Sequence, residues 1–235
     1  WAQIKHKKAA TDKKRGALYS KLAREITVAT RSGGPDAARN HRLRAAIERA
    51  RSFGLPKDNI ERAIERARGA SDADTLHEFL YEALGPEGTA ILIEGITDNT
   101  NRSLADIRQI LGRHSTKLVD PGSVLWNFER VGVFAVARPP SGDTNHEIEL
   151  ALIDAGARDV HEETTEWIVE TKLADVERVR EALRKRNILP TEADMSYMAK
   201  TQITLSHENA TILAALTEEL ANHPDIQSVY TNTSP

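Results

Sequence analysis

The sequence predicts an α+β fold in which an N-terminal three-helix bundle precedes two α/β domains, one of them ferredoxin-like (split βαβ) and inserted into the other. Three observations predict this fold. Apolar residues recur at helical spacing over residues 1–69, strand-length apolar segments begin after residue 75, and the elements between residues 129 and 199 follow the order β-α-β-β-α-β.

The basic N-terminal third, residues 1–75, is predicted to contain three amphipathic helices. "SGGP" at 32–35 and "FGLP" at 53–56 separate them, and Gly69 follows the last. Asp58 lies near the start of the third helix, where a carboxylate complements the helix dipole. The three apolar stripes are Leu18, Leu22 and Ile26; Leu43, Ala46, Ile47 and Ala50; and Ile60, Ala63, Ile64 and Ala67.

The middle domain is predicted to begin with a β-hairpin. Residues 76–84 and 89–96 have the composition of strands, and "GPEG" at 85–88 joins them. A helix at 101–114 and a short strand at 123–128 follow. Residues 202–232 add a strand, a helix and a strand, which are too few to fold alone. We therefore expect a discontinuous domain made of residues 76–128 and 200–235.

The inserted domain, residues 129–199, is predicted to have the split βαβ order. Strands are expected at 132–138, 159–163, 166–171 and 191–197, and helices at 144–155 and 174–186. This order gives an antiparallel sheet with two helices on one face.

Charge is distributed unevenly along the chain. The whole sequence has 32 Lys and Arg against 35 Asp and Glu, a net charge of -3. Residues 1–69 alone have 18 basic and 7 acidic residues, a net charge of +11, and the remainder has a net charge of -14. This split predicts a cationic module joined to an acidic body.

Several classes of function are disfavoured by what the sequence lacks. It has no apolar run of about 18 residues, which predicts no membrane span, and no cysteine, which favours the cytoplasm or an organelle matrix. Phosphate-loop, dinucleotide and hydrolase motifs are missing, and the eight histidines show no i, i+4 pair. We therefore expect no catalytic residues, no metal and no cofactor.

The clustered cations of the first third are the candidate nucleic-acid-binding residues. Like charges this close on a helix repel one another, so an anionic polymer such as a phosphate backbone is a natural partner. The alternative is a solvated surface that contacts the acidic body. Cations spread over several helices favour folded RNA modestly over DNA. The candidates are Lys5, Lys7, Lys8, Lys13, Lys14, Arg15, Lys21, Arg24, Arg31, Arg39, Arg42, Arg44, Arg49 and Arg51.

A second polar cluster lies in "TDNTNRS", residues 97–103, between a predicted strand and a predicted helix. Its candidate site residues are Asp98, Asn99, Asn101 and Arg102. Asp and Asn at such a junction are also typical of a turn followed by a helix N-cap, and we favour that interpretation over a ligand site.

The sequence resembles the YebC family over nearly its whole length. The resemblance rests on "WAQIKHKKAATDKKRG", "LRAAIERARSFGLPKDNIERAIERARG", "GPEGTAILIEGITDNTNRSLADIR" and "DPGSVLWNFERVGVF". Ala83 and Glu87 depart from it, since the family tends to have glycine at both positions.

The resemblance implies the three-domain fold above and two possible functions. One is a non-enzymatic translation factor that binds ribosomal RNA on the ribosome and relieves stalling. The alternative is a DNA-binding transcriptional regulator. The implied partners are the ribosome and its RNA, with DNA as the alternative. We expect a monomer in the cytoplasm, with the mitochondrial matrix as the alternative location.

Overall fold

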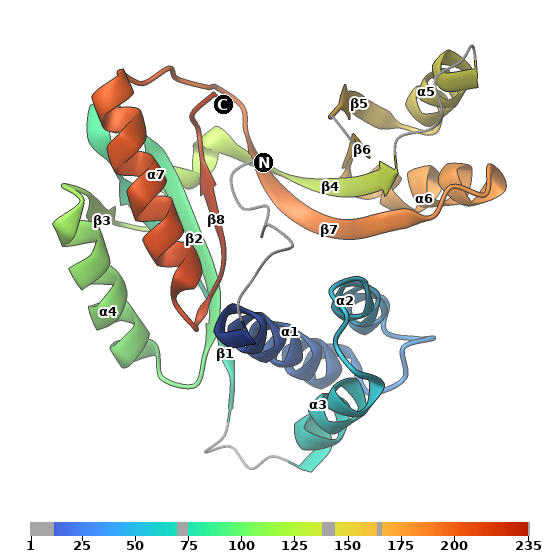
Figure 1. The fold of residues 1–235 in the computed structure, drawn as a ribbon, viewed down its shortest axis with the longest axis horizontal. Helices are drawn as coiled ribbons and strands as arrows, with labels where there is room; N and C mark the ends of the chain where they lie inside the picture. Colours follow the sequence, from blue (N-terminus) through green and yellow to red (C-terminus); the bar gives the residue numbers. More distant parts are fainter. Residues whose placement is uncertain (1–11, 70–74, 138–143, 164–165, 235) are drawn as a thin grey trace. The chain divides into compact units, whose positions relative to one another are not determined.

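The structure is a computed structural model that describes residues 12–69, 75–137, 144–163 and 166–234 (Figure 1). The chain divides into two compact units, which are described separately. The first contains residues 1–129 and 198–235, and the second contains residues 130–197. Within the described ranges, no helix combines the length and the apolar character needed to cross a bilayer.

Three helices open the first unit, as predicted. They are α1 (Asp12–Gly33), α2 (His41–Ser52) and α3 (Lys57–Gly69). Asn40 links the end of α1 to the start of α2, because its Oδ1 accepts from Leu43 N at 3.0 Å while its Nδ2 donates to Ala29 O at 2.7 Å. The predicted apolar stripes meet in one core that includes Leu22, Ile26, Leu43, Ala46, Ile47, Ala50, Ile60 and Ala63.

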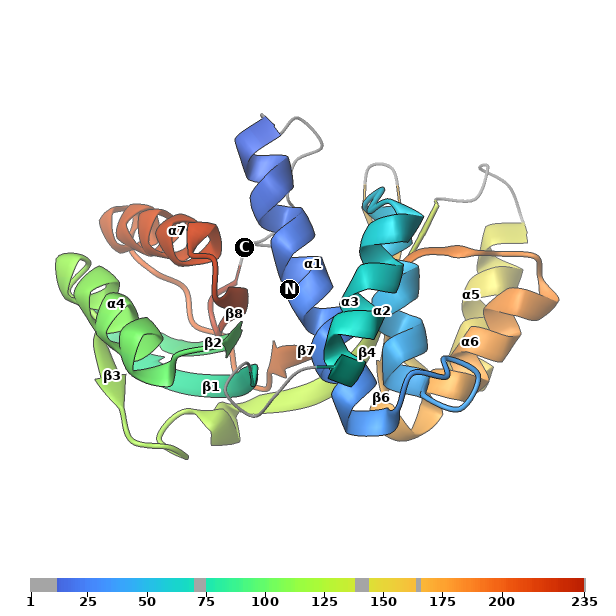
Figure 2. The same ribbon diagram turned by 90° about the horizontal axis from the view of Figure 1, so that it is seen from below.

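The first unit also contains a four-stranded sheet in the order β3-β1-β2-β8. Its strands are β1 (His77–Leu84), β2 (Ala90–Thr97), β3 (Lys117–Val119) and β8 (Ile226–Thr231). Two helices, α4 (Thr100–Arg113) and α7 (His207–Asn222), lie side by side on one face of this sheet (Figures 1 and 2). The C-terminal strand β8 is therefore the neighbour of β2 in the same sheet.

The turn between β1 and β2 is held by the side chain of a glutamate. Glu87 has a φ of +52°, in the left-handed region that favours glycine. Its carboxylate accepts from the Ser206 hydroxyl at 2.7 Å and from Asn209 Nδ2 at 2.6 Å. These bonds lower the pKa of Glu87 and connect the turn to the start of α7. The glutamate thus gains contacts that a glycine could not make.

The second unit is built around a four-stranded sheet in the ferredoxin-like order β5-β6-β4-β7. Its elements are β4 (Phe128–Ala137), α5 (Thr144–Asp154), β5 (Ala157–Glu162), β6 (Glu166–Lys172), α6 (Val176–Lys185) and β7 (Pro190–Ala199). Helices α5 and α6 lie next to each other (Figure 2). The core of this unit includes Phe134, Trp167 and Leu183. The predicted α+β fold class is confirmed.

Two predicted strands are wrong. Of the strand predicted at 123–128, residues 123–127 form a bend and a 3₁₀ helix at Leu125–Asn127, and only Phe128 belongs to β4, because the N–H groups of Val124 and Leu125 bond to a buried carboxylate and not to a neighbouring strand. The strand expected from residue 202 is reduced to an isolated bridge between Ile203 and Thr233. The three-residue strand β3 was too short to be predicted.

Candidate nucleic-acid interface

Several of the predicted cations are exposed on the helical part of the first unit. Arg15 is exposed near the start of α1, and Arg39, Arg44 and Arg51 are exposed on or just before α2. The Arg39 side chain is 90% exposed, and its Nε lies 3.6 Å from an Asp36 carboxylate oxygen. A solvated pair of this kind is weak, so the guanidinium can exchange Asp36 for another anion. Arg44 and Arg51 are seven residues apart and therefore share one side of α2. We call Arg39, Arg44 and Arg51 the α2 surface.

Other predicted cations are engaged within the chain or lie outside the described side chains. Arg42 forms two hydrogen bonds to the Glu78 carboxylate on β1, and Arg49 lies 3.7 Å from Glu25 on α1. Arg31 is half-buried. Lys5, Lys7 and Lys8 fall outside the described residues, as do the side chains of Lys13 and Lys14.

Helix α3 carries a different charge pattern. Its cations alternate with acids one turn away, so that Lys57 lies 3.4 Å from Glu61 and Arg68 lies 2.9 Å from Glu65. These exposed i, i+4 and i, i+3 pairs are typical of a solvated helix surface. Lys57 and Arg68 thus have acidic partners on their own helix, whereas Arg62 donates to Asp58 O at 3.2 Å and to Asn59 Oδ1 at 2.7 Å, and Arg66 is exposed.

Lys21 lies inside the first unit, although the sequence placed it among the surface cations. Its side chain is 6% exposed, and its Nζ donates to the carbonyl oxygen of Ala221 at 2.7 Å, near the end of α7. Burial, together with the nearby charges of Arg24 and Arg49, lowers the pKa of Lys21 from 10.5 to about 8. Lys21 therefore joins α1 to α7 and is not available to a phosphate.

The lowered pKa of Lys21 predicts a pH dependence of stability. The unfolded chain holds the Lys21 proton up to about pH 10.5, whereas the folded chain releases it above about pH 8, so the free energy of unfolding rises with pH in this window. Between pH 8 and pH 10.5 we expect the free energy of unfolding of the wild-type protein to rise by roughly 2–3 kcal/mol relative to that of Lys21→Met. Chemical denaturation of both proteins across the window measures the difference. If the free energies of unfolding of the two proteins changed in parallel with pH, the lowered pKa of a buried Lys21 would be contradicted.

Arg24 is another predicted cation that bonds within the unit, and its main partner is Asp225. The Asp225 side chain is 1% exposed, and one of its carboxylate oxygens accepts from Arg24 Nη1 at 2.5 Å. Arg24 also donates to the backbone oxygens of Pro224 at 3.1 Å and Ile96 at 3.3 Å. This single side chain therefore joins α1 to both the α7–β8 loop and the end of β2.

The "TDNTNRS" segment provides the other partners of Asp225. Three groups donate to Asp225 Oδ2: Ser103 Oγ at 2.6 Å, Arg102 Nη2 at 2.9 Å and Thr97 Oγ1 at 3.1 Å. Burial alone would raise the pKa of Asp225, but the donors Ser103, Arg102 and Arg24 outweigh it and hold the pKa well below 3.8. Asp225 is therefore an anion at every physiological pH.

The remaining residues of this segment have local roles. Asn99 caps α4, because its side chain accepts from Arg102 N at 3.0 Å, as the turn-and-cap interpretation predicts. Asp98 is exposed and lies 2.7 Å from Arg102, and Asn101 is exposed on the first turn of α4. The segment is thus largely consumed by internal bonds around Asp225, a residue that sequence reasoning missed.

Gly95 allows the backbone at Asp225 to approach β2. A Cβ at this position would lie 2.3 Å from Asp225 O and 2.2 Å from the Phe79 ring, which only glycine avoids. The pairing of β2 with β8 shifts between Glu94 and Gly95, and Ile96 N then donates to Asp225 O at 2.8 Å. This irregularity fixes the backbone of Asp225 directly beside the end of β2.

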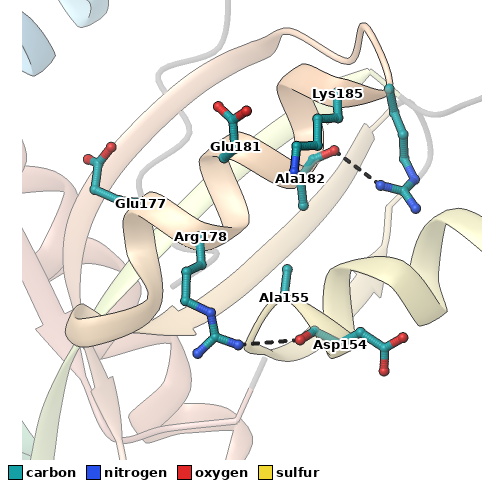
Figure 3. A pocket seen from close by; sticks show the side chains of 8 residues that line it. Asp154, Ala155, Glu177, Arg178, Glu181, Ala182 and Lys185 are labelled. Carbon is teal, nitrogen blue, oxygen red and sulfur yellow. Dashed lines mark hydrogen bonds between the residues drawn. The ribbon is translucent and has the colours of Figure 1, made fainter.

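The second unit has a surface hollow of about 470 Å³ between the end of α5 and α6 (Figure 3). Acidic, basic and alanine side chains line it, and Glu177, Arg178 and Glu181 each form an ion pair with a near neighbour. Arg178, for example, donates to Asp154 O at 3.4 Å and lies 2.8 Å from Asp175. Among the residues that the structure describes, no group of three or more His, Cys, Asp or Glu side chains could hold a metal ion. The hollow therefore has the character of ordinary solvated surface.

These features define a class of α+β protein in which a helical region with exposed arginines is joined through a buried carboxylate to an α/β sheet, with a ferredoxin-like unit inserted in the chain. Family models described as the TACO1/YebC protein N-terminal domain and the TACO1/YebC second and third domain match residues 1–70 and 76–233. The chain belongs to the TACO1/YebC family.

Relatives and a solved structure support this assignment along the whole chain. Probable transcriptional regulatory proteins from Pelodictyon phaeoclathratiforme and Moorella thermoacetica are each 42% identical to it, over 99% of this chain and 92% of theirs. The crystal structure of a conserved hypothetical protein from Aquifex aeolicus is similar with a TM-score of 0.90 and 36% identity, over 100% of this chain and 96% of that one. The names of the relatives describe regulators and not enzymes.

Proposed function

We propose that this chain is a non-enzymatic translation factor that binds ribosomal RNA on the ribosome through the cations of its helical region. The observation that supports it most is the set of exposed arginines of the α2 surface, within a third of the chain that has a net charge of +11. Each phosphate that such a cation neutralises releases a condensed counterion, which favours binding at moderate salt.

RNA is the better target because of where the exposed cations lie. A sequence-specific DNA reader commonly inserts one recognition helix into the major groove. Here exposed arginines lie at the start of α1, on or just before α2, and on α3. Recognition of folded RNA by its shape and phosphates needs only such distributed charges. The protein would act in the cytoplasm, or alternatively in the mitochondrial matrix, by stabilising a productive geometry of a stalled ribosome.

A DNA-binding transcriptional regulator is the second candidate, and the names of the relatives favour it. This function requires a clear preference for one defined duplex over an unrelated duplex at physiological salt. Binding to any duplex at low salt alone would reflect only the general attraction of cations for a polyanion.

Crosslinking in cells followed by sequencing of the bound nucleic acid separates the two candidates. We expect the crosslinked reads to be dominated by ribosomal RNA and to concentrate in a limited region of it, because one surface docks in one place. Enrichment of promoter DNA with ribosomal RNA at background level would overturn the translation proposal and support the alternative.

A further inference from the structure

The loop between β3 and β4 is held by a buried carboxylate. Glu82 on β1 is 4% exposed, and its oxygens accept from the N–H groups of Gly122 at 2.5 Å, Val124 at 2.6 Å and Leu125 at 2.9 Å. Burial alone would raise the pKa of Glu82, but the three donors outweigh it and lower the pKa. Glu82 is therefore a fixed anion around which the loop folds.

The other side of the loop is bonded to residues 200 and 201. Lys200 N donates to Asn127 O at 2.7 Å, and the Asn127 side chain exchanges hydrogen bonds with the backbone of Thr201 at 3.2 and 3.3 Å. The Lys200 ammonium donates to the carbonyl oxygen of Trp126 at 2.8 Å. The backbone of residues 122–127 is consequently fixed from both sides.

This rigid loop presents a large aromatic ring to solvent. The Trp126 side chain is 67% exposed, and its indole N–H donates to Ser123 O at 2.8 Å. Since the polar atom of the ring is already bonded, what the ring offers to a partner is its π surface. A side chain held in place before binding also loses little conformational entropy on binding.

We infer that Trp126 is a stacking platform for an unpaired nucleobase of RNA, an inference that rests on the proposed function. Aromatic rings beside cations are the usual means of binding single-stranded nucleic acid, because every base has a π face and every phosphate a charge. Lys200, whose ammonium donates to the backbone carbonyl oxygen of Trp126, provides a cation bonded to the same loop. An apolar protein partner is favoured less, since protein hot spots are surrounded by a ring of packed residues, whereas the loop that carries Trp126 also exposes Gly122 and Ser123.

The test compares Trp126→Ala and Trp126→Phe with the wild-type protein. The probes are a short unstructured single-stranded RNA and a fully paired RNA duplex. We expect Trp126→Ala to weaken single-strand binding roughly 5- to 150-fold and to leave duplex binding unchanged, because a duplex offers no free base. Trp126→Phe keeps an aromatic face and should retain most of the affinity. Thermal melting should be the same for all three proteins, because the ring is largely exposed.

The possible failures are distinguishable. If the wild-type protein binds both RNAs and Trp126→Ala binds them equally well, the stacking inference is overturned and the proposed function stands. Equal losses on single-stranded and duplex RNA would also overturn it, because they would indicate a backbone contact. A wild-type protein that binds neither RNA would remove the proposed function, and the stacking inference would fall with it.

Discussion

Replacing Asp225 with asparagine is expected to lower the free energy of unfolding of the first unit by about 2–5 kcal/mol. The carboxylate receives bonds from Arg24, Arg102 and Ser103, and its side chain is 1% exposed. Without the charge of Asp225 the two guanidinium groups lose their common anion. The NH₂ group of the asparagine would also face the N–H and O–H donors that bonded to the carboxylate. Chemical denaturation followed by circular dichroism measures the loss.

Asp98→Asn is the matched control for this variant. Asp98 binds the same Arg102 at 2.7 Å, but it is 53% exposed, so its removal should cost less than about 1 kcal/mol. The pKa of Asp225 is depressed in the folded protein, so its contribution is complete above the unfolded value of 3.8 and is lost as pH falls below it. Equal, small effects of both substitutions at neutral pH would show that Asp225 does not hold the unit together.

Neutralising the α2 surface is expected to weaken the binding of ribosomal RNA strongly. The triple variant Arg39→Gln, Arg44→Gln, Arg51→Gln should bind ribosomal RNA roughly 10- to 100-fold more weakly at moderate salt, at about 0.5–1 kcal/mol for each lost charge contact. The three side chains are exposed, so the thermal stability of the variant should match that of the wild-type protein. Filter binding with a ribosomal RNA fragment measures the affinity.

A second triple variant separates position from net charge. It removes an equal number of positive charges from α3, by the substitutions Lys57→Gln, Arg62→Gln and Arg68→Gln. The exposed cations Lys57 and Arg68 pair with acids on the same helix. We expect it to bind RNA nearly as well as the wild-type protein. If both triple variants lost affinity equally, binding would depend on the overall charge of the helical region and not on the α2 surface.

Much of the fold could be predicted because local patterns and packing agree. The i, i+3, i+4 stripes of α2 and α3 coincide with the buried residues Leu43, Ala46, Ile60 and Ala63, and the β-α-β-β-α-β order fixes the ferredoxin-like topology. The errors occur where tertiary contacts override local preference. Residues 123–128 were predicted as a strand, but the N–H groups of Val124 and Leu125 bond to Glu82, some 40 residues earlier in the chain.

The candidate site was harder to predict, because the exposure of each cation depends on which other elements of the unit pack against its helix. Lys21 and Arg24 belong to the same basic helix as Arg15, yet they face α7 and Asp225. One signal was available in the sequence. Val28 lies seven residues after Lys21, so the two side chains share one face of α1. An apolar residue on that face indicates that the face is buried, and both residues are buried in the structure. Asp225 gave no such signal, since it is an isolated acid in "HPDI" and lies 122 residues from Ser103.

The salt dependence of RNA binding tests the central claim most directly. Affinity of the wild-type protein for the ribosomal RNA fragment should fall linearly in a plot of log K against log salt concentration. The α2 triple variant should give a slope shallower by about 2–3, because each lost phosphate contact removes about 0.7–0.9 from it. Parallel slopes for the wild-type protein and this variant would contradict the claim that the α2 arginines contact phosphates.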